Sequence, residues 1–328
     1  MAFARVAGVM GVVAVGACSK APPQGDPVVA ASKVDAGASA GAEAGAGAGA
    51  GAGGGAGGDA GVPLPAGAVA CGTAGLACFR FASNADAFRW VLGHEPVILA
   101  IGEAHAQKGT EGIASATKRF TESMVPLLES RASDLLVEAW AGDPKCQKEV
   151  KQVATAQKPV QQAQAQSNSN EYLTLGSRAK SLGVTPHLLR PTCDDYANLA
   201  DAGADVITAS LGLIKRLTQS DATQLWKRNE ASKNGKLVVT YGGAMHNDLA
   251  PSEALRAYSF GPELATATAG RYVELDLIVP EYVKQTEAWE KLPWFAAFQA
   301  DKVARDKPTL YRLADNSFVL IFAKSPTR

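Results

Sequence analysis

Two apolar, β-branched runs of this chain each stop at a glycine and place a histidine three residues later. The pairs are Gly102 with His105 and Gly243 with His246, and the chain has only four histidines. An imidazole can act as a general base or bind a metal near neutral pH. A buried strand that ends in this way could therefore present a base or a ligand at the edge of a sheet.

Three further side chains that could take part in chemistry lie at or near the ends of such runs. Glu103 lies inside the first glycine–histidine segment, Glu138 ends a second apolar run, and Arg190 follows a third. The carboxyl ends of parallel strands meet at one edge of a sheet, where open α/β folds bind ligands. The sequence therefore predicts that these side chains converge with His105 and His246.

The predicted site has three interpretations. With Glu103, His105 and His246 as ligands, a divalent metal could activate a water molecule. Without a metal, a histidine could act as general base, a carboxylate could orient it, and Arg190 could bind an anionic group or an oxyanion. In the third interpretation the histidines only form hydrogen bonds in tight turns, while Glu138 and Arg190 make a buried ion pair.

The first residues have the pattern of a bacterial export signal. Arg5 is the only charge in the first seventeen, and the apolar stretch that follows it is too short to span a bilayer as a helix. Val15-Gly16-Ala17-Cys18 is similar to a lipobox, whose cysteine is lipidated and becomes the first mature residue. We expect residues 1–17 to be a signal peptide and Cys18 to carry the lipid. Ser19 favours the outer membrane, facing the periplasm.

A segment dominated by alanine and glycine follows, over residues 18–70. It has almost no large apolar side chain and buries too little surface to offset its backbone entropy, so we expect a disordered tether. Residues 71–328, which number 328 − 70 = 258, suffice for a single α/β domain. The formal net charge of the chain is zero, so no basic patch argues for nucleic acid.

Four cysteines follow Cys18. In an exported protein they favour disulfides over a metal site. Cys71 and Cys78 are close in sequence and could staple the start of the domain, and Cys146 would then pair with Cys193. The other two pairings stay open.

Apolar periodicity predicts the elements that position the candidate residues. Strands and helices alternate through the centre of the chain, which favours a mostly parallel sheet covered by helices. Buried strands are expected at 97–101, 134–138, 184–189 and 237–241. Helices are expected at 111–130 with a bend at Pro126, at 171–182, and from 207, where the helix continues or restarts near 221–230. The polar residues 147–166 are expected to form an exposed helix or a mobile excursion.

The C-terminal part has a different pattern. Residues 271–279 alternate apolar and polar side chains, and Asp315-Asn316 predicts a hairpin between 309–313 and 317–323. We expect antiparallel strands to be added there, with a helix over 289–298 between them.

The two glycine–histidine motifs resemble those of a known superfamily. Gly102-Glu103-Ala104-His105 after a strand, with Gly243 and His246 late in the chain, is similar to the pattern shared by erythromycin esterases, ChaN-type haem-uptake lipoproteins and the TraB/Tiki proteins. The resemblance covers most of residues 95–280. It implies an α/β fold whose site includes Glu138 beside both motifs, with Arg190 as a further residue.

The resemblance implies more than one activity. Erythromycin esterases are metal-independent hydrolases with a histidine base, Tiki-like members are metal-dependent proteases, and ChaN-type members are lipoproteins that bind haem. The lipobox favours the last group. However, Ala106-Gln107-Lys108-Gly109 stands where that group often has further histidines, which argues against haem or metal ligation by this loop. Tyr241 or Tyr258 could serve as the axial haem ligand, although tyrosines near a strand end are more often packing residues.

We therefore expect a lipid-anchored envelope protein with a hydrolase-type site that acts on a small molecule or a peptide, with a divalent metal as a possible cofactor. The alternatives are a non-enzymatic haem- or iron-binding uptake lipoprotein on the same fold and a catalytically inactive member. The residues expected to carry catalysis are Glu103, His105, Glu138, His246 and Arg190.

Overall fold

The computed structural model describes residues 13–15, 62–71, 76–301 and 305–326. The predicted lipidation site Cys18 and most of the predicted signal peptide and tether lie outside these residues. Within the described part, no helix combines the length and the apolar character needed to cross a membrane.

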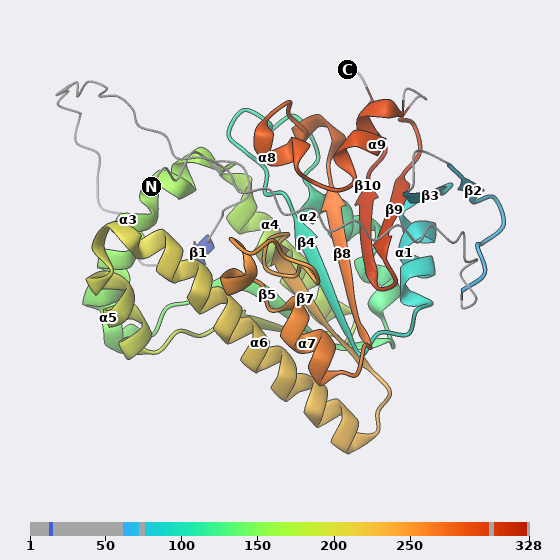
Figure 1. The fold of residues 1–328 in the computed structure, drawn as a ribbon. Helices are drawn as coiled ribbons and strands as arrows, with labels where there is room; N and C mark the ends of the chain where they lie inside the picture. The colour runs from blue at the N-terminus through green and yellow to red at the C-terminus, as the bar shows by residue number, and fades with distance from the viewer. Residues whose placement is uncertain (1–12, 16–61, 72–75, 302–304, 327–328) are drawn as a thin grey trace. The chain divides into compact units, whose positions relative to one another are not determined.

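One mixed sheet organises the domain (Figure 1). Its parallel part has the strand order β6–β5–β7–β4–β8–β10, and antiparallel pairing continues through β9, β3 and β2. A short strand, β1, pairs in parallel with the last three residues of β5. The strands are β1 (Val13–Val15), β2 (Val69–Ala70), β3 (Ala77–Arg80), β4 (Ile98–Glu103), β5 (Ala132–Ala141), β6 (Thr185–Leu189), β7 (Leu237–Gly243), β8 (Tyr272–Ile278), β9 (Thr309–Ala314) and β10 (Ser317–Ile321).

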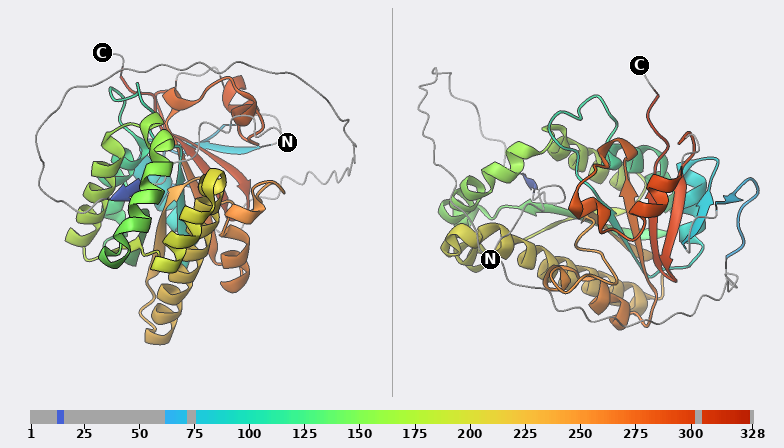
Figure 2. Two further views of the ribbon diagram at one scale, coloured as in Figure 1. Left: turned by 90° about the vertical axis from the view of Figure 1, so that its left-hand side faces the viewer. Right: turned by 45° about the horizontal axis from the view of Figure 1, so that its top comes forward.

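Helices cover both faces of the sheet (Figures 1 and 2). The strands alternate their side chains, so that Leu99 packs with the cluster under α1, α2 and α4, while Ile98 packs with the cluster under α3, α5, α6 and α7. A third cluster lies under α8 and α9. The helices are α1 (Asn84–Leu92), α2 (Ala116–Ser123), α3 (Gln147–Ala163), α4 (Ser167–Ser181), α5 (Cys193–Asp201), α6 (Val206–Ser232), α7 (Gly261–Ala267), α8 (Glu287–Glu290) and α9 (Phe295–Ala300).

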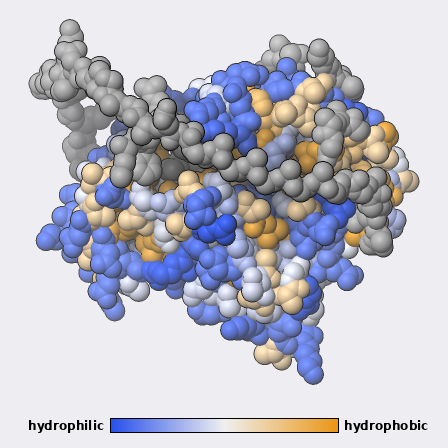
Figure 3. Space-filling model, in the orientation of Figure 1, coloured by the Kyte–Doolittle hydropathy of each residue, from blue (hydrophilic) through white to orange (hydrophobic). Residues whose placement is uncertain are grey.

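Five short 3₁₀ turns complete the described elements. They are η1 (Val125–Leu128), η2 (Pro144–Cys146), η3 (Gly203–Asp205), η4 (Arg256–Tyr258) and η5 (Pro280–Tyr282). The face shown in Figure 3 is mostly hydrophilic, with smaller apolar areas between, as expected where amphipathic helices turn their polar sides outward.

The structure confirms the predicted fold class and the four central strands. The predicted helix over 111–130 begins only at Ala116, because Ser115 caps it, and Pro126 confines the remainder to η1. The helix predicted from 207 is one continuous helix, α6.

Two C-terminal predictions were wrong. Strand β8 was expected to be antiparallel, but it pairs in parallel with β4 and with β10. The chain between β8 and β10 contains two helices and β9, which is long enough for a crossover connection. The single helix expected over 289–298 is split into α8 and α9, with Pro293 between them.

The folded part begins earlier than residue 71. The carbonyl of Val62 accepts a hydrogen bond from Trp90 Nε1, and β2 pairs with β3 before the predicted boundary. The apolar residues near 62–70 give this stretch a surface to bury, unlike the alanine–glycine run before it. The two predicted disulfides, Cys71–Cys78 and Cys146–Cys193, are confirmed.

Candidate active site

The two glycine–histidine segments lie on neighbouring strands. β4 and β7 pair in parallel, with Gly102 opposite Gly242 and Glu103 opposite Gly243. Beyond the ladder, the amide of Ala244 donates to the carbonyl of Glu103 at 3.1 Å. The topology therefore brings the two motifs to one edge of the sheet, as their sequence pattern predicts.

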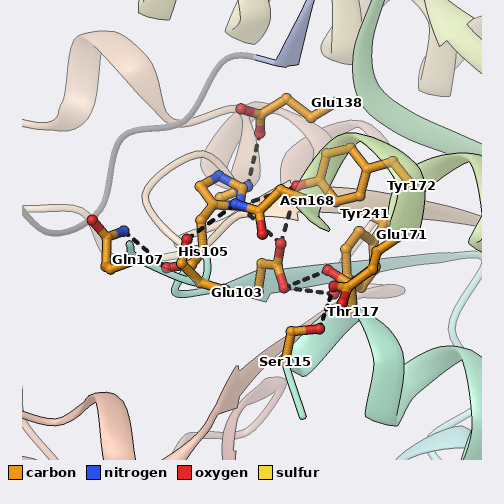
Figure 4. Close-up of polar contacts among 12 residues, drawn as sticks. Glu103, His105, Gln107, Ser115, Thr117, Glu138, Asn168, Glu171, Tyr172 and Tyr241 are labelled. Carbon is orange, nitrogen blue, oxygen red and sulfur yellow. Dashed lines mark hydrogen bonds and ion pairs between the residues drawn. The ribbon is translucent and has the colours of Figure 1, made fainter. Parts of the chain in front are cut away.

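Glu103 is a buried hydrogen-bond acceptor at the centre of this edge (Figure 4). Its Oε1 accepts from Tyr172 Oη at 3.0 Å and from His105 Nδ1 at 2.8 Å. Its Oε2 accepts from Thr117 Oγ1 at 2.9 Å and from Tyr241 Oη at 2.8 Å. Both oxygens are thus fully engaged, and Glu103 holds His105 in one orientation.

This network favours the charged forms of both Glu103 and His105. Burial alone would raise the pKa of Glu103, but the hydrogen bond and charge of His105 and the hydroxyls of Tyr241 and Thr117 lower it. Burial alone would lower the pKa of His105, but the hydrogen bond and charge of Glu103 and the charge of Glu138 raise it. The pair therefore favours a carboxylate beside an imidazolium.

The second nitrogen of His105 is unused. Nε2 is buried and has no hydrogen-bond partner among the described residues. The loop behind it is fixed, because the carbonyl of Ala106 accepts from Ala165 N and from Asn168 Nδ2. His105 therefore offers Nε2 to a group that enters the site.

His246 has the same arrangement. Its Nδ1 lies 2.8 Å from the carbonyl of Tyr258, which can only accept, so Nδ1 carries the proton. In the neutral ring the lone pair is then on Nε2, which lies 3.9 Å from Glu138 Oε1. This distance is too long for a direct hydrogen bond and suits a bridging water.

Glu138 reaches β7 because a glycine stands opposite it. Its Oε2 accepts from the amide of Gly243 at 2.8 Å. A Cβ atom at Gly242 would overlap that oxygen and lie 2.7 Å from the Glu138 Cβ. The Gly242-Gly243 pair thus allows the carboxylate to approach the backbone closely.

A cavity of about 10 Å³ lies beside Glu138 and His246. Thr240 Oγ1 and Asn247 Oδ1 are buried, lack partners among the described residues, and belong to residues that line this cavity. A cavity of this size with several polar groups is suited to a single water molecule.

A second polar layer lies on the neighbouring strand β8. Asn247 Nδ2 donates to Asp276 Oδ1 at 2.9 Å, and Glu274 Oε2 accepts from Leu249 N at 2.9 Å. Burial raises the pKa of Asp276 to about 7, and burial together with the charges of Asp276 and Asp248 raises the pKa of Glu274 well above its ordinary value. The Asn247 contact ties the turn that carries His246 to β8.

Two predicted site residues have other roles. Arg190 is exposed and lines a separate groove. Within the described part of the chain it makes no hydrogen bond or ion pair to the other predicted catalytic residues, which are Glu103, His105, Glu138 and His246. It therefore forms no ion pair with Glu138. Tyr241 donates its hydroxyl to Glu103 and stacks on Phe120 in the core, so it is not placed to bind haem iron.

The ligand atoms of Glu103, His105 and His246 do not all lie within 4.8 Å of one another, so these three residues do not form a metal site in this structure. Within the ranges that the structure covers, the sole group of three acidic, histidine or cysteine ligand atoms within 4.8 Å of one another is Asp143, Cys146 and Cys193, and both cysteines are in a disulfide. Glu103, predicted as a ligand with His105 and His246, has both oxygens occupied by hydrogen bonds.

Sequence reasoning missed several residues of the site. Tyr172 and Thr117 come from helices whose sequences carry no catalytic pattern, and they meet Glu103 only through the packing of α4 and α2. Asn247 could have been suspected, since it directly follows His246.

No family model, curated protein or solved structure matches this chain. The resemblance of its motifs to the erythromycin esterase, ChaN and Tiki superfamily therefore stays a prediction.

Proposed function

We propose that the protein is a hydrolase whose site uses two histidines, one as base and one as acid. The observation that carries this proposal is that each imidazole has its Nδ1 fixed by an acceptor, Glu103 or the Tyr258 carbonyl. Nε2 of His105 has no hydrogen-bond partner among the described residues, and Nε2 of His246 lies 3.9 Å from Glu138 Oε1. Fixing one nitrogen sets the tautomer and aims the other.

His246 is the proposed general base. A water in the cavity between its Nε2 and Glu138 Oε1 would lose a proton to Nε2 as it attacks the substrate. The Glu138 carboxylate would orient that water and stabilise the imidazolium that forms. The fixed Nδ1–H of His246 keeps the Nε2 lone pair directed at the water.

His105 is the proposed general acid. Because Glu103 favours its protonated form, Nε2–H can donate a proton to the leaving group or a hydrogen bond to a developing oxyanion. Both histidines are buried, so these interactions act in a medium of low dielectric constant.

The substrate would approach next to Glu138. In the structure β1 pairs with Ala139–Ala141, directly after Glu138. Since β1 lies inside the proposed signal peptide, its cleavage would free this edge of β5 for a substrate.

The proposal includes a location in the cell envelope. We propose that Cys18 carries a lipid that anchors the protein to the outer membrane, which the lipobox-like sequence supports. Labelling of the native host with a radioactive fatty acid tests this. The wild-type protein should incorporate the label and Cys18→Ala should not, and equal labelling of both would contradict lipidation at Cys18.

The decisive experiment is a screen of ester and peptide substrates. His246→Ala and His105→Ala should each lower kcat by roughly 10²-fold or more, because each removes an acid–base group. His187→Ala is the matched control, since His187 pairs with Asp134 outside the site. Activity in either site variant equal to that of the control would contradict the proposal.

The same preparation tests the metal and haem alternatives. We expect hydrolysis to persist after chelation with EDTA, and haem titration to give no Soret shift that depends on His105 or Tyr241. Loss of activity on chelation, restored by one divalent metal, would replace the metal-free mechanism by a metal-assisted one.

A further inference from the structure

A second concave site lies beside the edge strand β6. It is a groove of about 590 Å³ between α4 and α6, floored by β6 and by the end of β5. This volume is in the range of small-molecule sites, and it far exceeds the water-sized cavity at His246. Tyr172 lines the groove and hydrogen-bonds to Glu103, so the groove adjoins the active site.

The groove is largely apolar and stays open to solvent. Leu173 of α4 is 49% exposed, one of the few large hydrophobic residues in the described part of the chain with such exposure. An exposed leucine in a concave apolar site is typical of ligand-binding surfaces. The apolar lining comprises Val137, Ala141, Leu173, Pro186, Leu188 and Leu225.

The charges on the lining favour an anion. Lys180 and Arg190 are exposed, and neither forms an ion pair with any residue that the structure describes. Asp221 on α6 supplies one opposing carboxylate, and His187 is engaged with Asp134. Two cationic groups against one carboxylate give the groove a positive excess.

The floor of the groove argues against a peptide strand as the ligand. β6 has no described neighbour on its outer edge, but Pro186 is the second of its five residues. Proline lacks the amide proton, and within sheets it occupies positions where that proton would face outward. Recognition in the groove therefore relies on apolar contact and charge.

From these observations we propose that the groove binds an amphiphile with an unbranched acyl chain and an anionic head group, such as a long-chain carboxylate. The chain lies along β6 against the apolar lining, and Lys180 and Arg190 bind the head group. This site does not depend on the hydrolytic role proposed for His105 and His246.

Calorimetric titration of the full chain with laurate tests the proposal. Dodecyltrimethylammonium, which has a chain of the same length and a cationic head, is the matched ligand. We expect laurate to bind with a Kd in the micromolar range and the cationic amphiphile to bind at least tenfold more weakly. Equal binding of both would show mere hydrophobic adsorption and overturn the proposal.

Gly176→Leu fills the groove from within α4. A Cβ at Gly176 meets only Pro186 Cβ, at 3.5 Å, and leucine favours a helix more than glycine does, so we expect the variant to fold and to lose laurate binding. Gly212→Leu is the control, because a Cβ there meets nothing within 4 Å and Gly212 is not on the lining. Unchanged binding by Gly176→Leu would contradict the assignment.

Two charge variants give an independent test. Lys180→Gln combined with Arg190→Gln should weaken laurate binding at least tenfold, whereas Arg178→Gln, an exposed arginine on α4 outside the lining, should not. Equal effects of the double variant and the control would overturn the head-group assignment. If haem binds in the groove and laurate does not, the groove is assigned to a tetrapyrrole and the proposal is overturned.

The assay separates this inference from the proposed hydrolase. It measures binding and can be repeated in His246→Ala, where we expect laurate affinity to be unchanged. If the protein binds laurate but hydrolyses no ester or peptide substrate, the groove assignment stands and the hydrolase proposal is rejected. If it hydrolyses a substrate but does not bind laurate, the hydrolase proposal stands and the groove assignment is rejected.

Discussion

Glu103 sets the charge of His105 through a single carboxylate. Its hydrogen bond and charge raise the pKa of His105 against burial, which alone lowers it. In Glu103→Gln we expect the His105 pKa to fall below 6.5, its ordinary value, because burial then prevails. NMR titration of the imidazole resonances measures this, and an unchanged His105 titration would contradict the role of Glu103.

The same pair makes stability depend on pH. The pKa of Glu103 is lowered, so its contribution is present above pH 4.5 and is lost as pH falls through the folded-state value. The pKa of His105 is raised, so its contribution is complete below pH 6.5 and is lost as pH rises through the folded-state value. Both contributions are complete between pH 4.5 and pH 6.5, so the loss of unfolding free energy in Glu103→Gln should be greatest in this interval. Denaturant unfolding of the wild type and the variant across pH measures this loss, and a loss that does not change with pH would contradict the pairing.

Asp276 has the opposite effect on stability. Burial raises its pKa from 3.8 to about 7, so the folded state binds a proton that the unfolded state releases. Its contribution is present below pH 3.8 and is lost as pH rises toward 7. Asp276→Asn should therefore gain stability relative to the wild type as pH rises over this interval, by at least about 1.4 kcal/mol, the equivalent of one pKa unit. A constant difference, measured by urea unfolding, would count against this.

At the scale of elements, the glycines of β7 determine how close β5 can bring its carboxylate. Gly242→Ala should displace Glu138, lower activity, and cost about 1–3 kcal/mol of stability through overpacking. Gly212→Ala in α6 meets open space and should stabilise the protein by about 0.5–1 kcal/mol. Thermal unfolding and kcat are measured for both variants. Equal melting temperatures and equal kcat values would contradict the close approach of Glu138 to Gly242.

At the scale of the whole molecule, the disulfides close loops of very different length. Cys146–Cys193 spans 47 residues and Cys71–Cys78 spans 7. On the chain-entropy account, replacing both cysteines by serine should cost about 4 kcal/mol for the first pair and about 2 kcal/mol for the second. Denaturant unfolding of the two double variants checks the order, and a larger loss for the short loop would contradict it.

The sequence determined the local features of this protein. Apolar runs that end at glycines predicted β4 and β7, and alternation with helical periodicity predicted the α/β class, because these signals need only neighbouring residues. The convergence of Glu103, His105, Glu138 and His246 followed from the rule that parallel strands share a carboxyl edge.

Only the tertiary structure decided which side chains complete the site. Tyr172 and Thr117 reach Glu103 because α4 and α2 pack on the same face, and Arg190 lies apart because β6 is the outer strand. The alternating pattern of residues 271–279 suggested an antiparallel strand, yet β8 lies between β4 and β10 and pairs in parallel with both. Strand order and helix packing depend on contacts between residues far apart in the chain, which local periodicity does not encode.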